Sequence, residues 1–204
     1  MLDRAANAAL MPLFQVIARG LVRAGIGADA VTLVGFAIGV AAAVSIAMQS
    51  YALGLALLLA SRLADGLDGP VARLTQATDR GAYLDITLDF LFYASIPLAF
   101  AIANPAANAL PTAVLLAAFI GTGSSFLAFA VFAQKRGIAS SDYPNKGLYY
   151  LGGLTEATET LICFALMCLW PDRFAWWAYG FAALCALTIA TRIVGGAKAL
   201  TDRV

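Results

Sequence analysis

The chain has 204 residues, of which 62% are hydrophobic and 12% charged, and its mean hydropathy is +0.84. This composition is typical of a protein that crosses a membrane several times, and it excludes an ordinary soluble globular domain. The 13 basic residues balance 12 acidic ones, so the sequence has no basic excess for binding nucleic acid. We therefore expect a membrane protein with no nucleic-acid partner.

Residues 1–27 are predicted to form an amphipathic helix that lies on the membrane surface. Apolar residues recur there at helical spacing: Leu10, Phe14, Ile17 and Leu21. Arginines fall near the polar side of the same helix. A soluble helix packed against the membrane domain is the alternative interpretation. Gly25 and Gly27 then break the helix, and Asp29 is a candidate N-cap for the next one.

Residues 28–204 are predicted to form one catalytic domain of six transmembrane helices, so the fold class is an all-α integral membrane protein. The expected spans are about 31–48, 52–72, 81–103, 112–134, 148–170 and 174–196. The shortest holds 18 residues, which rise about 27 Å along a helix and so cover the hydrocarbon core. Polar and helix-breaking residues mark the connections, notably 49–51, 75–80 and 104–111.

The distribution of Lys and Arg predicts the orientation of these spans. Six spans place both termini on one side of the membrane. Arg173 falls on the opposite side. The other basic residues fall at the termini or at the connections between spans two and three and spans four and five: Arg4, Arg19, Arg23, Arg62, Arg73, Arg80, Lys135, Arg136, Lys146, Arg192, Lys198 and Arg203. This bias predicts that the termini face the cytoplasm, in a membrane that we expect to be a bacterial inner membrane.

Four carboxylates lie between apolar runs in the stretch 65–89: Asp65, Asp68, Asp85 and Asp89. The first two are three residues apart and the last two are four apart, so each pair shares one face of its helix. Carboxylates within a membrane are costly and usually functional, and four close together repel one another unless cations lie among them. Because the chain contains no His, a pair of oxygen-liganded Mg²⁺ ions is the simplest candidate, and Mn²⁺ would also fit.

This stretch resembles the signature of the CDP-alcohol phosphotransferase family, integral membrane enzymes that transfer a phospho-alcohol from a CDP-linked donor to an acceptor hydroxyl. The matching residues, in order, are Asp65, Asp68, Gly69, Ala72, Arg73, Gly81, Asp85 and Asp89. The connection between Arg73 and Gly81 is one residue shorter than in the family pattern. Residues 28–32 also resemble the P-N-x-x-T sequence that precedes the first span in the family, without its Pro and Asn.

The resemblance implies that Asp65, Asp68 and Asp85 are metal ligands. It implies that Asp89 is both a ligand and the general base for the acceptor hydroxyl. It also implies a donor-binding surface: Gly66, Gly69, Ala72, Arg73 and Gly81, with the arginine on a donor phosphate. For each glycine alone, ordinary helix packing is the alternative. Homodimerisation is a further implication, with small-residue faces of the later spans as candidate contacts.

The acceptor side has weaker candidates. Lys135, Arg136 and Lys146 could bind a phosphate on the acceptor, or could simply anchor the cytoplasmic side of the domain. Glu156 and Glu159 lie early in the fifth predicted span. They could orient a polar acceptor, pair with the arginine of the sixth span or face an aqueous cavity, and we assign them no catalytic role.

The leading hypothesis is a Mg²⁺-dependent phosphatidyltransferase that joins CDP-diacylglycerol and a small alcohol to give a membrane phospholipid and CMP. Glycerol 3-phosphate is the first acceptor to consider, while serine, an inositol phosphate, choline and another lipid stay open. The signature equally allows a soluble CDP-alcohol donor with diacylglycerol as acceptor. A metal transporter would favour carboxylates spread through the bilayer, often with His. A catalytically silent lipid-binding homologue is the remaining alternative, and the complete motif argues against it.

Overall fold

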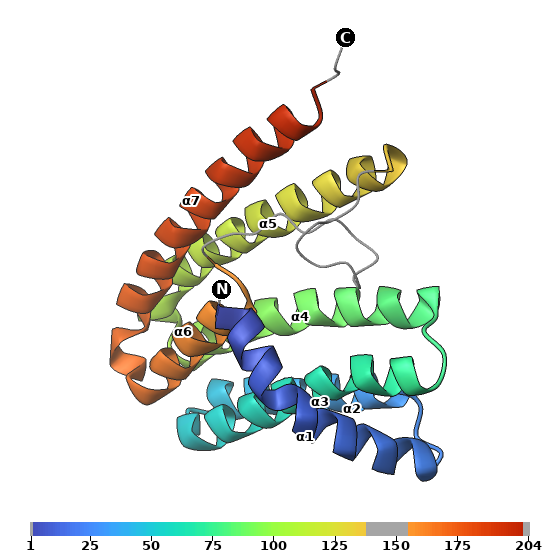
Figure 1. Ribbon diagram of the computed structural model, residues 1–204. Coiled ribbons are helices and arrows are strands. Elements are labelled where there is room, and N and C mark those ends of the chain that lie inside the picture. Colours follow the sequence, from blue (N-terminus) through green and yellow to red (C-terminus); the bar gives the residue numbers. More distant parts are fainter. Residues whose placement is uncertain (1, 138–154, 202–204) are drawn as a thin grey trace.

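The computed structural model describes residues 2–137 and 155–201, which form helices joined by short connections (Figure 1). The helices are α1 Leu2–Arg23, α2 Ala28–Ala47, α3 Tyr51–Leu74, α4 Asp79–Ala103, α5 Pro105–Lys135, α6 Ala157–Leu169, the short 3₁₀ helix η1 Pro171–Arg173, and α7 Phe174–Ala199. No strand occurs in the two described ranges. The all-α fold class predicted from the sequence is therefore confirmed for them.

Several of these helices suit a membrane. In the described ranges, four helical stretches are long and apolar enough to cross one: Ala28–Ala47, Asp79–Ala103, Pro105–Lys135 and Pro171–Ala199. The second half of α3 carries charged residues. The 13 residues of α6 extend about 20 Å, less than the roughly 30 Å hydrocarbon core. The chain is thus consistent with an integral membrane protein, and the number of six spans stays a prediction.

Both predicted connections beside α3 are present but shorter than predicted, because α3 begins at Tyr51 and α4 begins at Asp79. The chain turns between α2 and α3 at Gln49, which has a φ of +63°. The loop from Thr75 to Thr78 joins α3 to α4. Thr78 then caps α4, since its Oγ1 accepts a hydrogen bond of 3.0 Å from the N–H of Gly81. Both halves of the aspartate motif therefore lie on helices that flank one short loop.

The predicted turn over 104–111 is wrong beyond its first residue. Asn104 caps α5, and Pro105 occupies its first turn, where the missing N–H of proline costs no helical hydrogen bond. Asn108 lies inside the helix, where its Nδ2 donates a hydrogen bond of 3.0 Å to the carbonyl oxygen of Phe100 in α4. Helix α5 therefore begins seven residues before the fourth predicted span, 112–134.

The fifth predicted span, 148–170, falls partly outside the described residues. In the described part the helix begins at Ala157, because Glu156 and Glu159 form a capping box. The N–H of Glu156 donates to Oε2 of Glu159 at 3.1 Å, and the Glu156 carboxylate accepts from the N–H of Glu159. The structure thus corrects the predicted start of the helix and gives both glutamates a role in capping it.

The helices are arranged around α2 and α5. Helix α2 packs against both α3 and α4, while α5 packs against α7 and also against α4 (Figure 1). Helix α1 crosses the outer side of α3, where Phe14 and Ala18 are buried. Its helical structure agrees with the prediction for 1–27, and its place on the membrane surface stays a prediction.

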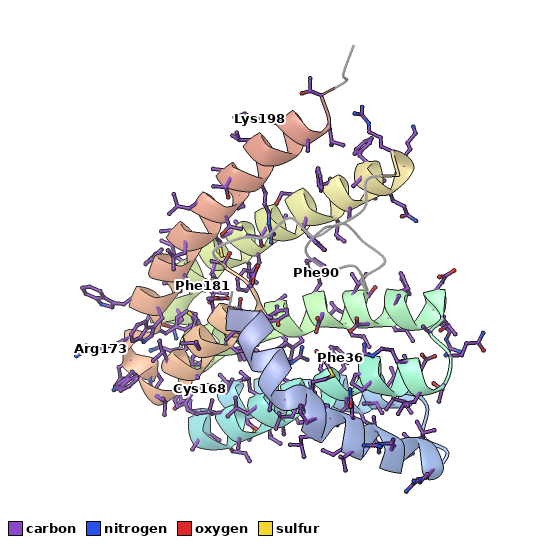
Figure 2. All side chains as sticks on the ribbon, in the orientation of Figure 1. Phe36, Phe90, Cys168, Arg173, Phe181 and Lys198 are labelled. Carbon is purple, nitrogen blue, oxygen red and sulfur yellow. The ribbon has the colours of Figure 1, made fainter. Side chains whose placement is uncertain are left out.

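A hydrophobic core with several phenylalanines joins these helices. Phe92, Phe100, Phe164 and Phe174 are fully buried. The rings of Phe100 and Phe174 stack with centroids 4.8 Å apart, which ties α4 to α7. Figure 2 shows Arg173 before the first turn of α7 and Lys198 near the opposite end of that helix. Arg173 and Lys198 thus lie at opposite ends of α7, and the orientation of the basic residues relative to a membrane stays a prediction.

The small residues of α5 serve contacts within the chain. A Cβ on Gly121 would lie 2.5 Å from Cδ1 of Ile189 in α7, and one on Gly123 would lie 2.4 Å from Cε1 of Phe90 in α4. Only a glycine allows these side chains to approach so closely. Gly121 and Gly123 therefore allow α5 to pack closely against α7 and α4.

Candidate active site

The second half of α3 and the first half of α4 bring three carboxylates together. Asp65 and Asp68 lie one turn apart on α3, and Asp85 lies on α4, which returns in the opposite direction after the loop. One oxygen from each of the three lies within 4.8 Å of the others. All three side chains are partly buried. The spacing in the sequence predicts each pair on one face of its helix, and the family resemblance implies that the two pairs meet. The role of these residues as metal ligands stays a prediction.

This donor set fits a divalent metal ion. Three carboxylate oxygens at such separations can be bridged by one hard cation, and oxygen ligands suit Mg²⁺ or Mn²⁺. Partial burial leaves room for further ligands such as phosphate oxygens or water. Without a cation the three negative charges would repel one another. Asp65, Asp68 and Asp85 are therefore the residues that could hold a metal here.

Thr32 orients one of these carboxylates. Its Oγ1 donates a hydrogen bond of 2.7 Å to Oδ2 of Asp68, from α2 to α3. Thr32 is itself buried, at 6% exposure. Thr32 ends the stretch that resembles the P-N-x-x-T sequence, and its contact with an aspartate is not predicted from the sequence. That resemblance was the available signal for its position.

Asp89 lies outside the three-carboxylate group and is held by an arginine. Its Oδ1 accepts a hydrogen bond of 2.6 Å from Nη1 of Arg62. The same Nη1 lies 3.4 Å from Oδ2 of Asp65. Because α3 and α4 run in opposite directions, the residue one turn before Asp65 lies opposite the residue one turn after Asp85. Arg62 therefore bridges the two halves of the motif.

This role of Arg62 is not predicted from the sequence, where the residue is one of the basic positions assigned to the termini and the cytoplasmic connections. The side chain is instead buried, with 9% exposure. Its guanidinium carbon lies 3.7 Å from the ring centroid of Phe92. The available signal was its spacing, since a charge three residues before Asp65 shares the face of the aspartates. Arg62 is a buried partner of the motif inside α3, so its predicted place at a connection between spans is corrected.

The glycines of the predicted donor surface have different neighbours. A Cβ on Gly66 would lie 2.7 Å from Cε2 of Phe14 in α1, so Gly66 makes room for helix packing. A Cβ on Gly69 would lie 3.4 Å from Nη1 of Arg73, so the arginine folds back over this glycine. Ala72 is partly buried in the same turn. Packing, the alternative set beside donor binding, accounts for Gly66.

Gly81 lies where the first turns of α2 and α4 meet. A Cβ on it would lie 3.1 Å from Oδ1 of Asp29. Asp29 lies in the first turn of α2, where the helix dipole favours a carboxylate, and its Oδ2 lies 3.6 Å from Nε of Arg80. The N-cap of α2 is Gly27, so the prediction of Asp29 as N-cap is wrong by two residues.

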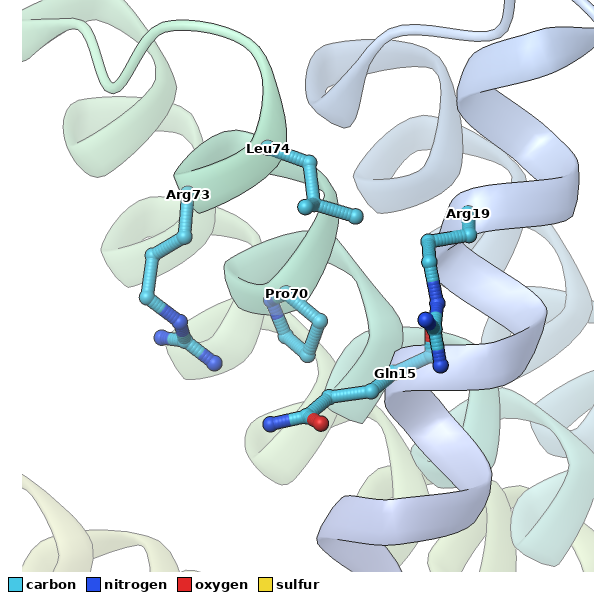
Figure 3. Close-up of a pocket in the computed structure, with 5 residues that line it drawn as sticks. All are labelled: Gln15, Arg19, Pro70, Arg73 and Leu74. Carbon is cyan, nitrogen blue, oxygen red and sulfur yellow. The ribbon is translucent and has the colours of Figure 1, made fainter.

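A pocket of about 310 Å³ lies between α1 and the end of α3 (Figure 3). It is lined by Gln15 and Arg19 from α1 and by Pro70, Arg73 and Leu74 from α3. Two guanidinium groups give this pocket a positive charge, which suits an anionic group. The predicted phosphate contact, Arg73, thus lines this pocket together with Arg19, while none of the four motif aspartates is among the lining residues.

The predicted acceptor residues lie at the end of α5 or beyond it. Lys135 and Arg136 are exposed, and Nη1 of Arg136 donates a hydrogen bond of 2.6 Å to the carbonyl oxygen of Leu200, after α7. This bond ties the ends of α5 and α7 together. Lys146 lies outside the described residues. An acceptor role for these residues stays a prediction.

Comparisons with known proteins identify relatives over nearly the whole chain. The model of the CDP-alcohol phosphatidyltransferase family matches residues 26–192, which include all of the aspartate motif. The inner membrane protein YnjF of Escherichia coli K12 is 52% identical over 196 residues, which cover 96% of this chain and 95% of that protein.

Solved structures of the Mycobacterium tuberculosis phosphatidylinositol phosphate synthase PgsA1 have a similar fold. The form with CDP-DAG bound has a TM-score of 0.74 at 22% identity, over 95% of this chain and 99% of that one. The form with manganese and citrate has a TM-score of 0.73 at 22% identity, over 94% of this chain and 93% of that one. At such identities the likeness concerns the fold.

Proposed function

Because the chain belongs to the CDP-alcohol phosphatidyltransferase family, we propose that it transfers a phosphatidyl group from CDP-diacylglycerol to a small alcohol and releases CMP. The observation that carries this proposal is the convergence of Asp65, Asp68 and Asp85 within 4.8 Å, at the positions of the family signature. The solved relative with CDP-DAG bound supports a lipid-linked donor. We keep glycerol 3-phosphate as the first acceptor to test.

We assign the binding of two divalent ions to the aspartates, with Mg²⁺ first and Mn²⁺ as the alternative. The ligands in this proposal are Asp65, Asp68, Asp85 and Asp89. Such ions, when bound, neutralise the charge of the donor phosphates and of the leaving group. The manganese in a solved relative supports a divalent requirement. The role of the chain is to present anionic oxygens at a fixed separation.

In this proposal Asp89 also moves a proton, and two arginines bind the donor. The acceptor oxygen bonds to the phosphorus that carries diacylglycerol, and the bond from this phosphorus to the CMP oxygen breaks, so CMP leaves with the electron pair. Asp89 accepts the hydroxyl proton; because its Oδ1 is bonded to Arg62, we assign the proton to Oδ2. Arg73 and Arg19 attract donor phosphates to the pocket beside α3.

We further propose a six-span domain over 28–204, preceded by an interfacial helix over 1–27, in a bacterial inner membrane. The name of the E. coli relative supports this membrane. Both termini and the aspartates would face the cytoplasm, where CDP-linked donors are available. A homodimer is also part of the proposal, and family membership is its only support. The small residues Gly121 and Gly123 do not support a dimer contact, because they already pack against side chains of the same chain.

The experiment that tests this function measures CMP release from CDP-diacylglycerol by the purified protein with Mg²⁺, across a panel of acceptor alcohols. Release that depends on one acceptor is expected, and Asp89→Asn should lower it about a hundredfold through loss of the base. Failure of the folded, metal-binding protein to release CMP with any acceptor would contradict the proposal. The same assay with a CDP-alcohol and diacylglycerol would then test the reverse arrangement of donor and acceptor.

Thr32→Val should weaken metal binding about tenfold, because hydrogen bonds to a ligand fix its orientation and tune its affinity. Valine has nearly the shape of threonine, so the change removes the 2.7 Å bond to Asp68 and the 3.1 Å contact of the same hydroxyl with the carbonyl oxygen of Ala28. Titration with Mn²⁺, followed by electron paramagnetic resonance, measures the effect.

Thr112→Val is the matched control for this prediction. Thr112 is also buried, at 3% exposure, but its Oγ1 bonds to the carbonyl oxygen of Pro97 in the core. The control should lose some stability and keep its Mn²⁺ affinity. Equal Mn²⁺ affinities for Thr32→Val and the unmodified protein would mean that Asp68 needs no support from α2.

A further inference from the structure

Arg62 occupies a position that the family signature does not specify. It lies one turn before Asp65 on α3, and its Nη1 reaches Asp89 on α4 at 2.6 Å and Asp65 at 3.4 Å. Both of these aspartates are about one third exposed, while the arginine side chain has 9% exposure. The guanidinium therefore lies on the buried side of the carboxylates, between them and the aromatic core.

The surroundings fix this guanidinium in place. It lies flat against Phe92, with 3.7 Å between its central carbon and the ring centroid. Its Nη2 donates a hydrogen bond of 3.2 Å to Oγ of Ser61, which itself donates one of 2.7 Å to the carbonyl oxygen of Gly35 in α2. Three helices thus hold the charge where it is.

These contacts satisfy the guanidinium only in part. Within the described residues, the buried Nε of Arg62 has no hydrogen-bond partner. A buried arginine that served packing alone would be expected to satisfy its donors more fully, because each unpaired donor costs free energy. The contacts with the carboxylates of Asp65 and Asp89 compensate for the burial of this charge.

We propose that Arg62 is a positioning residue: a fixed internal cation that holds Asp89 in the metal-free protein and weakens metal binding on the Asp89 side of the site. This inference rests on the proposed function, since it gives the aspartates a metal. A cation that approaches Asp89 has to share its carboxylate with the guanidinium, whose Nη1 already donates a hydrogen bond of 2.6 Å to Oδ1. Arg62 therefore competes with the cation for Asp89.

The test compares Mn²⁺ binding by the purified full-length protein and its Arg62→Met variant, with electron paramagnetic resonance as the readout. Methionine keeps an unbranched chain over the Phe92 ring and removes the charge. The variant should bind Mn²⁺ about tenfold more tightly, because a competing positive charge within 4 Å has gone. Without metal it should melt at a lower temperature, and Mn²⁺ should raise its melting temperature more than that of the unmodified protein.

Arg80→Met is the matched control. It removes the same charge near the start of α4, but Arg80 is exposed and lies beside Asp29 instead of the motif. Its Mn²⁺ affinity should equal that of the unmodified protein. An Arg62→Met variant that binds Mn²⁺ no more tightly than the unmodified protein would overturn the proposal.

Should Arg62→Met not yield folded protein, the double variant R62M/D89N decides. It removes both members of the pair, so folded protein should be recovered. Equal failure of the double variant would overturn the proposal, because Arg62 would then serve packing and not Asp89. CMP release is measured in parallel: tighter Mn²⁺ binding without any CMP release would refute the proposed reaction and leave this inference standing.

Discussion

Replacing Asp85 with asparagine is expected to lower CMP release about a thousandfold, because the change removes one of the anionic oxygens on which charge stabilisation at phosphorus depends. Asp85 is the member of the three-carboxylate group that α4 contributes, and the other two come from α3. Without it, Asp89 is the one proposed ligand that α4 still contributes, and the carboxylate of Asp89 is already bonded to Arg62. Asparagine has the same shape, so the fold should persist.

Two measurements check this expectation together. CMP release reports the reaction, and Mn²⁺ binding reports the site without reference to any substrate. Asp79→Asn is the matched control, because Asp79 is an exposed carboxylate in the first turn of the same helix. The control should keep both properties. An Asp85→Asn variant that binds Mn²⁺ and turns over like the unmodified protein would remove Asp85 from the site.

The aspartate site could be predicted from the sequence because its geometry is largely local. Intervals of three and four residues place Asp65 with Asp68, and Asp85 with Asp89, whatever the rest of the chain does. The short polar loop between the two helices then makes these helices antiparallel neighbours of each other. The one further fact needed, that the two pairs face each other, came from family resemblance.

Arg62 and Thr32 could not be assigned in the same way, because their partners depend on how three helices pack. Thr32 reaches Asp68 from α2, a contact across 36 positions of the chain. Arg62 reads as one more basic residue in a positive-inside count, and its burial against Phe92 appears only in the folded protein. Sequence patterns identify the residues that carry charge, and packing decides which of them compensate one another.

The starts of two helices also differ from the prediction, although the sequence contains the signal for each of them. The start of α5 was misplaced because Asn104 and Pro105 act together as cap and first residue, although asparagine and proline are also common in turns. The start of α6 depends on a capping box between Glu156 and Glu159, which hydropathy alone does not reveal. In both cases a polar pattern within the sequence marks the correct boundary, and an apolar count does not.

The position of Arg62 also leads to the largest stability effect that we expect, at a glycine in α2. A Cβ on Gly39 would lie 2.6 Å from Cδ2 of Phe92 and 2.9 Å from Oγ of Ser61. These are the ring beneath the guanidinium and the hydroxyl that holds it. Phe92 is fully buried and has no free space into which to move. Gly39→Ala should therefore destabilise the protein by about 1–3 kcal/mol through overpacking.

The measurement is the apparent melting temperature of the purified protein in detergent, with Gly20→Ala as the control. Gly20 has nothing within 4 Å of an added Cβ, so alanine there should be neutral or slightly stabilising. Because Phe92 and Ser61 would carry any displacement to Arg62, Gly39→Ala should also lower CMP release in the fraction that stays folded. A Gly39→Ala protein as stable and as active as the Gly20→Ala control would contradict this prediction. It would show that α2 can move away from Phe92 and Ser61, and that these two residues do not hold Arg62 rigidly.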